Sequence, residues 1–267
     1  MQLLQYEFFQ NALIGMTLIS VACAVIGVYV VTRRMVFIAG GITHTCFGGL
    51  GLGYYLGWNP LLAAAAFAIG GGLSVEAISR GRVRRDSAIA VVWAVGMALG
   101  ILFIFLTPGY VPELNAFLFG NVLNITRADL WVFAAFAAAA VALFAAFRRV
   151  IMAVSFDEDF ARTRYLPVRM VNTVMMIMVA ICIVLTIKMI GIMLLMSMMS
   201  LPQMIAEQWC RRYSGIMLFS AAASIASCLT GLWLSVVTDV PASAMIVLAQ
   251  AALFFLSGPL AGMIRRR

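Results

Sequence analysis

The sequence predicts an all-α integral membrane protein, a polytopic bundle of about nine transmembrane helices, and three observations lead to this fold class. The chain has 267 residues, of which 64% are hydrophobic and 10% charged, whereas soluble domains are about half apolar and a quarter charged. Its mean hydropathy is +1.07. Many apolar runs reach the roughly 20 residues that span a bilayer core, and short basic clusters separate them.

The apolar runs divide the chain into nine candidate spans, and the break beside Lys188 is the least marked boundary. No segment between the runs is long enough to form a soluble domain, so residues 1–267 are expected to form a single transmembrane domain. The candidate spans are residues 8–32, 36–57, 59–79, 88–106, 127–147, 170–187, 190–205, 214–237 and 241–263.

The basic residues indicate the orientation of the spans. All Lys and Arg residues except Arg127 and Lys188 follow odd-numbered spans, so they fall on one face of the predicted bundle. Positively charged loops stay in the cytoplasm, which predicts an external N-terminus and a cytoplasmic C-terminus. An eight-span arrangement would divide the clusters between both faces. Because the clusters lie between apolar runs, they predict topology, and no nucleic-acid partner is expected.

The second span contains His44, the only histidine of the chain. It lies nine residues after Met35, which places it about 13–14 Å into the membrane, near the midplane. An ionisable group at this depth is a candidate functional residue, because imidazole binds transition metals and titrates near neutral pH. A hydrogen bond that holds neighbouring helices together is an equally good interpretation at this stage.

Three glycines follow on the same span at intervals of four residues, Gly49, Gly53 and Gly57. This spacing leaves one helical face without side chains, which lets another backbone approach closely. Packing is therefore the favoured role, although such a face could also border a pathway.

Asp239 and Lys188 are two further charged candidates near the predicted outer side. Asp239 precedes Pro241, a pattern that favours a cap at the start of the last helix, and a carboxylate at the mouth of a cation route is the alternative. Lys188 is the only lysine. It is expected to extend to the outer interface or to pair with a carboxylate such as Asp239.

The longest cytoplasmic connection contains the stretch "SFDEDFARTRYLPV". Asp157, Glu158 and Asp159 come early in it and Arg162 comes late, an order that suits the dipole of a short helix over about residues 157–165. A charged helix in this loop is a natural docking element for a peripheral protein. A solvated linker would have the same composition.

The chain contains no GxxxxGK[ST] phosphate-binding loop, so it is not expected to hydrolyse ATP or to be an enzyme. A zinc metalloprotease would require HExxH, which needs two histidines, and the sequence has one. Any uphill step would therefore draw its energy from a partner or an ion gradient.

Five stretches, in this order and on this topology, resemble the membrane permease subunits of ATP-driven metal importers, the zinc/manganese/iron-type ABC permeases. The resemblance covers nearly the whole chain. The stretches are "VVTRRMVFIAGGITHTCFGGLGLGYYLGWNP", "LNAFLFGNVLNIT", "SFDEDFA", "KMIGIMLLMSMMSLPQMIA" and "TDVPASAMIVL".

The resemblance implies a homodimer in the bacterial inner membrane, with a pathway along the dimer interface and alternating access to its two sides. It also implies a cytoplasmic ABC ATPase that binds ATP, and an extracytoplasmic solute-binding protein. The divalent metal, manganese, zinc or iron, would be the substrate, and no cofactor is expected in this chain.

The resemblance also implies roles for individual residues. His44 matches the histidine of the family's second-helix motif, although Gly41 stands where the family tends to have an acid. Asp239 matches the acid of a D-x-P-A-G-like element, and Lys188 matches a lysine that precedes a glycine. The "FDEDFA" stretch matches the segment that couples the permease to its ATPase. The alternative is a proton-coupled secondary transporter of a cation, with His44 and Asp239 as proton-linked sites.

Overall fold

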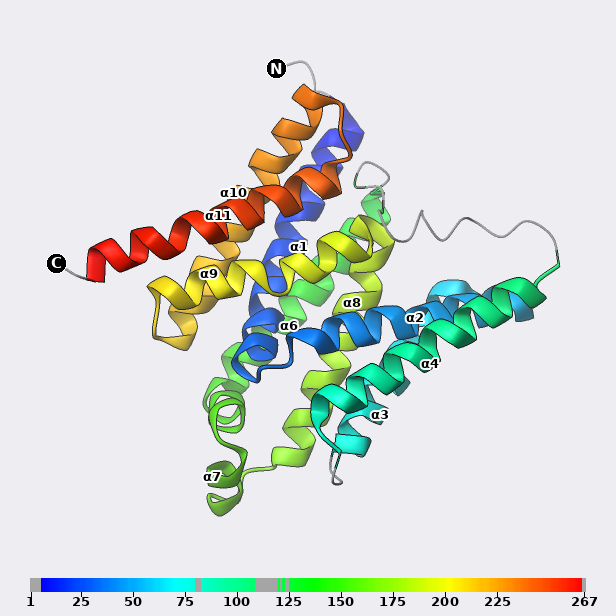
Figure 1. The fold of residues 1–267 in the computed structure, drawn as a ribbon, viewed down its shortest axis with the longest axis horizontal. Coiled ribbons are helices and arrows are strands. Elements are labelled where there is room, and N and C mark those ends of the chain that lie inside the picture. The colour runs from blue at the N-terminus through cyan, green and yellow to red at the C-terminus, as the bar shows by residue number, and fades with distance from the viewer. Residues whose placement is uncertain (1–5, 80–82, 109–119, 121, 123–124, 266–267) are drawn as a thin grey trace.

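The computed structural model describes residues 6–79, 83–108, 120, 122 and 125–265, and within these ranges it contains α-helices and no strand (Figure 1). This confirms the predicted all-α fold class. The helices are α1 (Glu7–Thr32), α2 (Val36–Leu56), α3 (Pro60–Ser79), α4 (Arg85–Leu106), α6 (Arg127–Phe156), α7 (Glu158–Thr163), α8 (Val168–Met198), α9 (Leu201–Trp209), α10 (Tyr213–Thr238) and α11 (Ala242–Arg265).

The helices form two groups that meet along α8 and α1. Figure 1 shows α2, α3 and α4 side by side on one flank, and their mutual contacts are among the most extensive in the molecule. Helices α1, α6 and α10 lie on the other side, and α7 lies beyond the ends of α6 and α8. In the most apolar stretch of α1, and likewise in that of α2, 78% of the residues are buried inside the protein. The corresponding share is 22% in α4 and in α6. The outer helices therefore present apolar side chains to lipid.

Eight helical segments of the described chain are long and apolar enough to cross a membrane, in line with the bundle of about nine helices that the sequence predicts. Residues 168–209 count as one segment of 42 residues. The predicted break beside Lys188 is a bend inside α8, centred on Gly191 with φ 75° and ψ 175°. Glycine adopts this conformation readily because it has no Cβ atom. The two parts of α8 point in different directions (Figure 1).

A second glycine fits against this bend. Gly120 also has a positive φ, 61°, and a Cβ atom on it would stand 2.3 Å from the Gly191 nitrogen. The backbone around Gly120 thus packs directly onto the bend of α8. Most of the surrounding stretch "LNAFLFGNVLNIT" lies outside the described residues.

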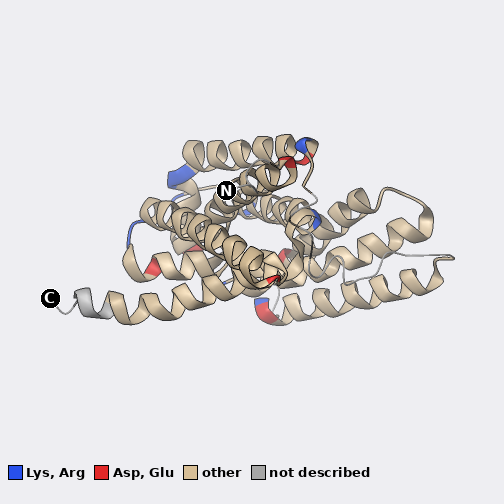
Figure 2. Ribbon diagram, turned by 90° about the horizontal axis from the view of Figure 1, so that it is seen from above, with Lys and Arg blue, Asp and Glu red and all other residues tan. Residues whose placement is uncertain are grey.

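Charged residues are few, and most of the helical length carries none (Figure 2). Arg127, one of the two cations outside the basic clusters, pairs with Glu7 at 2.6 Å. Arg33 follows the opposite end of α1 and pairs with Glu158. Two of the basic clusters, at Arg33 and Arg85, therefore meet at Glu158, whereas Arg127 forms a separate ion pair at the other end of α1.

The expected glycine contact face is confirmed for two of its three members. A Cβ atom on Gly49 would stand 2.4 Å from the Ala63 carbonyl oxygen, and one on Gly53 would stand 2.7 Å from the Pro60 Cα atom. These glycines let α2 and α3 touch backbone to backbone. Gly57 instead ends α2 in a left-handed conformation with φ 67°.

Replacing Gly49 with alanine is expected to lower the free energy of unfolding by about 2 kcal/mol, because the added methyl group would force α2 and α3 apart. The midpoint of thermal unfolding of the purified protein in detergent measures this loss. Gly70→Ala is the matched control, since a Cβ atom on Gly70 meets nothing within 4 Å. Equal midpoints for the two variants would contradict the close packing of α2 on α3.

Candidate functional site

His44 lies on α2 with its side chain half-buried. Its ring stacks on Trp93 of α4, with centroids 4.4 Å apart and an interplanar angle of 11°. A second ring, that of Phe47, lies 6.0 Å away. The Nδ1 atom is buried and has no hydrogen-bond partner among the described residues. The structure thus holds this imidazole by stacking, and shows no hydrogen bond from it to a neighbouring helix.

The threonines beside His44 do not serve the imidazole. Thr43 donates its hydroxyl hydrogen bond to the Ala39 carbonyl oxygen, and Thr45 donates to the Gly41 carbonyl oxygen at 2.7 Å. Thr45 also lies within hydrogen-bond distance, 3.3 Å, of the Val92 carbonyl oxygen on α4. Neither hydroxyl bonds to the imidazole, so the polar atoms of the imidazole stay available.

One turn before His44, two side chains cover Gly40. The Met196 sulfur would lie 3.0 Å from a Cβ atom on Gly40, and the Trp93 ring would lie 3.2 Å from it. The neighbourhood of the imidazole is therefore aromatic and thioether in character. No group of three or more His, Cys, Asp or Glu side chains could hold a metal ion in the part of the chain that the structure describes.

Asp239 is exposed at the C-terminal end of α10, where it adopts a left-handed conformation with φ 56°. The expected cap at the start of the last helix is wrong, because Asp239 ends α10 and α11 begins three residues later, at Ala242. Helices α10 and α11 pack on each other, on α1, α8 and α9, whereas α2 packs on α1, α3, α4 and α8. The structure thus does not bring Asp239 and His44 together within one chain.

Lys188 pairs with Asp129, with 2.5 Å between Nζ and Oδ1. The expectation of a pair with a carboxylate holds, but the partner is Asp129 and not Asp239. Asp129 was not among the predicted site residues. It belongs to a capping box with Thr126 at the start of α6, and the T-x-x-D spacing at the start of an apolar run could have indicated it.

The short helix predicted over about residues 157–165 is present as α7, which has six residues. Asp157 is its N-cap and accepts a hydrogen bond from the Phe160 amide at 2.9 Å. Asp159 is 94% exposed and Arg162 is 64% exposed, and Arg162 also lies 3.6 Å from Glu158. Large exposed aromatic side chains surround them, namely Phe156, Phe160 and Tyr165.

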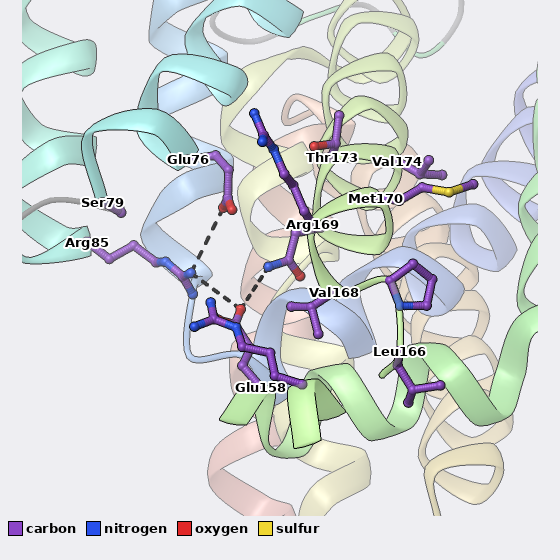
Figure 3. A pocket seen from close by; sticks show the side chains of 13 residues that line it. Glu76, Ser79, Arg85, Glu158, Leu166, Val168, Arg169, Met170, Thr173 and Val174 are labelled. Carbon is purple, nitrogen blue, oxygen red and sulfur yellow. Dashed lines mark hydrogen bonds and ion pairs between the residues drawn. The ribbon is translucent and has the colours of Figure 1, made fainter. Parts of the chain in front are cut away.

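Glu158, the remaining acid of this stretch, faces the bundle. Its carboxylate accepts hydrogen bonds from Arg33 and from Asn172 at 2.8 Å, and Arg85 lies 3.9 Å away. Arg33 also donates to the Val154 carbonyl oxygen at 2.8 Å. Figure 3 shows the contacts of Glu158 with Arg85 and with α8. One carboxylate therefore ties α7 to the end of α1 and to the first turns of α4 and α8.

A second carboxylate extends this network. Glu76 on α3 is buried and lies 4.0 Å from Arg85, which stands between it and Glu158 (Figure 3). The sequence did not single out Glu76 or Arg85, because their roles depend on contacts between helices that are distant along the chain.

The environment of Glu158 shifts its pKa. Partial burial raises the pKa of this carboxyl, but the hydrogen bonds from Arg33 and Asn172 and the nearby positive charges outweigh burial and leave the pKa below its ordinary value. The carboxylate is therefore ionised in the folded protein at neutral pH.

The fold and these sites define a polytopic helical membrane protein with one short charged helix held outside the spans. The family model "ABC 3 transport family" matches residues 5–260, and the chain belongs to that family. An uncharacterized membrane protein of Synechocystis sp. is 36% identical over 96% of this chain and 92% of its own length. The manganese transport system membrane protein MntC of Halalkalibacterium halodurans is 30% identical over 99% of this chain and 92% of its own length.

A solved structure has the same fold. PsaBC from Streptococcus pneumoniae in complex with Fab matches 95% of this chain and 92% of the compared chain, with a TM-score of 0.84 and 25% sequence identity. The match over almost the whole length of both chains means that the helix arrangement described above is shared with this solved structure.

Replacing Glu158 with glutamine is expected to lower the free energy of unfolding by about 2 kcal/mol at pH 7, because Arg33, whose side chain is 6% exposed, would lose its charged acceptor. A carboxyl whose pKa is lowered on folding stabilises the protein above its unfolded pKa of about 4.3, and this contribution is lost as the pH falls through the folded pKa. Thermal unfolding of wild type and variant from pH 7 to pH 3 should therefore converge at the acid end.

Asp159→Asn is the matched control for this comparison. Its carboxylate is 94% exposed and lies 3.8 Å from Arg162, so its loss should change the unfolding free energy by less than about 0.5 kcal/mol. A Glu158→Gln variant as stable as wild type at pH 7 would show that the carboxylate does not anchor α7.

Proposed function

We propose that this chain is the permease subunit of an ATP-driven importer that moves a divalent transition metal, manganese, zinc or iron, into the cytoplasm. The proposal rests on the match of residues 5–260 to the ABC 3 transport family, supported by the likeness to a manganese transport system membrane protein over 99% of the chain. The chain contains no nucleotide-binding loop in its sequence, so a partner ATPase would bind and hydrolyse the ATP.

Helix α7 is the proposed docking element for that ATPase. Asp157, Asp159 and Arg162 supply its exposed charge, and Phe160 is 55% exposed beside them. Glu158 has a different role, because it anchors α7 to the bundle from within. A peripheral protein that grips α7 would therefore pull on α1, α4 and α8 through Glu158.

The proposed pathway follows the interface of a homodimer and passes His44. The imidazole is half-buried, unbonded at Nδ1, and oriented by Trp93. One chain offers a single imidazole at this level, so a second copy would supply a second nitrogen ligand to a dication. Alternating access then requires this interface to open to each side in turn.

The orientation follows from the two polar ends. The basic end, with Arg33 and Arg85, is proposed to face the cytoplasm of a bacterium, and the end with Glu7, Lys188 and Asp239 to face outside. An extracytoplasmic solute-binding protein would deliver the metal at that outer end, where Asp239 is exposed.

The structure offers less support for the alternative, a proton-coupled secondary transporter. Such a protein needs ionisable groups within the membrane that exchange protons. Glu76 and Asp129 each lie within 4.0 Å of a cation, so both carboxylates already take part in ion pairs near the ends of their helices.

Reconstitution tests the function directly. Proteoliposomes with this chain, its partner ATPase and its solute-binding protein are expected to accumulate one of Mn²⁺, Zn²⁺ and Fe²⁺ only when ATP is supplied. Accumulation that continues without the ATPase and follows a proton gradient would instead establish the secondary transporter.

Replacing His44 with alanine is expected to reduce ATP-dependent metal uptake by more than about tenfold, since the loss of one ligand contact weakens a metal site by that order. The amount of folded protein should remain unchanged, because His44 makes no hydrogen bond. Thr43→Val is the control, as its hydroxyl bonds only to its own helix. Unchanged uptake in the His44 variant would remove His44 from the pathway.

A further inference from the structure

A cavity of about 1020 Å³ lies at the basic end, where α7 faces the adjoining ends of α3, α4 and α8 (Figure 3). Three arginines and two glutamates line it, so the arginines are in excess by one. These charged residues are Glu76, Arg85, Glu158, Arg162 and Arg169.

Four of the five charged residues compensate one another. Arg85 lies within 4.0 Å of both glutamates, and Arg162 lies 3.6 Å from Glu158. Arg169 is different, because its guanidinium makes no ion pair or hydrogen bond anywhere in the described chain. Figure 3 shows its side chain extending between those of Glu76 and Thr173 in this view. The cavity therefore contains one uncompensated positive charge.

One wall of the cavity is apolar and belongs to a membrane span. Leu166, Val168, Met170 and Val174 line it, and the span of α8 begins at Val168. Met170 is 66% exposed, and Val174 lies one turn further along the same face of α8. The uncompensated charge and the apolar wall thus adjoin each other where the helix enters the lipid.

We infer that this cavity binds the phosphate group of an anionic phospholipid. Arg169 contacts the phosphate, since basic pockets between transmembrane helices bind the head groups of anionic lipids. The acyl chains lie along Met170 and Val174. The inference stands apart from the transport function, since it depends only on the cavity and on the membrane location of α8.

Two other occupants fit less well. A transported dication would be repelled by the free guanidinium of Arg169 and by the excess of arginine. An acidic side chain of a partner protein would satisfy the charge, but it would leave Met170 and Val174 uncovered in water. A phospholipid satisfies the charge and covers the apolar wall at once.

The test is a lipid titration of the purified protein in neutral detergent, followed by native mass spectrometry. Wild type is expected to bind phosphatidylglycerol more tightly than phosphatidylcholine. In Arg169→Gln the affinity for phosphatidylglycerol should fall about fivefold, the effect of one basic residue near a membrane surface. Arg169→Lys, which keeps the charge, should restore most of it. Arg149→Gln is the matched control, because Arg149 is exposed on α6 and lines none of the cavities described.

Three outcomes would overturn the inference. Equal losses in Arg169→Gln and Arg149→Gln would mean that binding follows the general basic charge. Displacement of phosphatidylglycerol by millimolar glycerol phosphate would mean that the site takes a free phosphate and that the apolar wall contributes nothing. Unchanged lipid binding in Arg169→Gln, together with loss of co-purification with the ATPase, would assign Arg169 to a protein interface.

Discussion

The ion pair between Glu158 and Arg33 is the contact on which the basic end of this molecule depends. A bilayer supplies no hydrogen bonds to charged or backbone groups, so the charges must meet at the ends of the helices and satisfy one another there. Glu158 and Arg33 are 125 residues apart in the chain, and their contact joins the outermost helix, α7, to the end of the most central one, α1. Asn172 and Arg85 complete the set of partners, so four helices share one carboxylate.

The bend in α8 fixes the helix arrangement at the other end of the molecule, as the Glu158–Arg33 pair does at the basic end. Gly191 turns the helix, the backbone at Gly120 fills the inside of that turn, and Lys188 fixes the turn before it to Asp129. A side chain at Gly120 would collide with the backbone of α8, which is less able to yield than another side chain, and the positive φ of Gly191 suits a residue without a Cβ atom. The bend is therefore set by backbone contact, with an ion pair beside it.

Apolar run length predicted the helices well, since lipid forces a long apolar segment to bond its backbone internally as a helix. The start of α6 at Arg127 agrees with the prediction. The helix continues to Phe156, but its backbone is kinked at Phe147, with φ −109° and ψ 16°, which is the residue where the predicted span ends. The partners of Lys188 and of Glu158 could not be predicted from the sequence. Lys188 pairs with Asp129, 59 positions away, and Glu158 pairs with Arg33, 125 positions away. The stacking of His44 on Trp93 likewise depends on how α2 and α4 pack.

Helix α8 connects the two ends to the imidazole between them. Its first turns reach Glu158 through Asn172, its middle is tied to α6 through Lys188, and after the bend Met196 packs over Gly40, one turn from His44. A displacement of α7 would act on α8 through Asn172, and α8 would transmit it along a continuous backbone to the neighbourhood of His44. This physical route from the proposed docking helix to the proposed metal ligand runs within one chain, so each copy in a dimer could respond to its own ATPase.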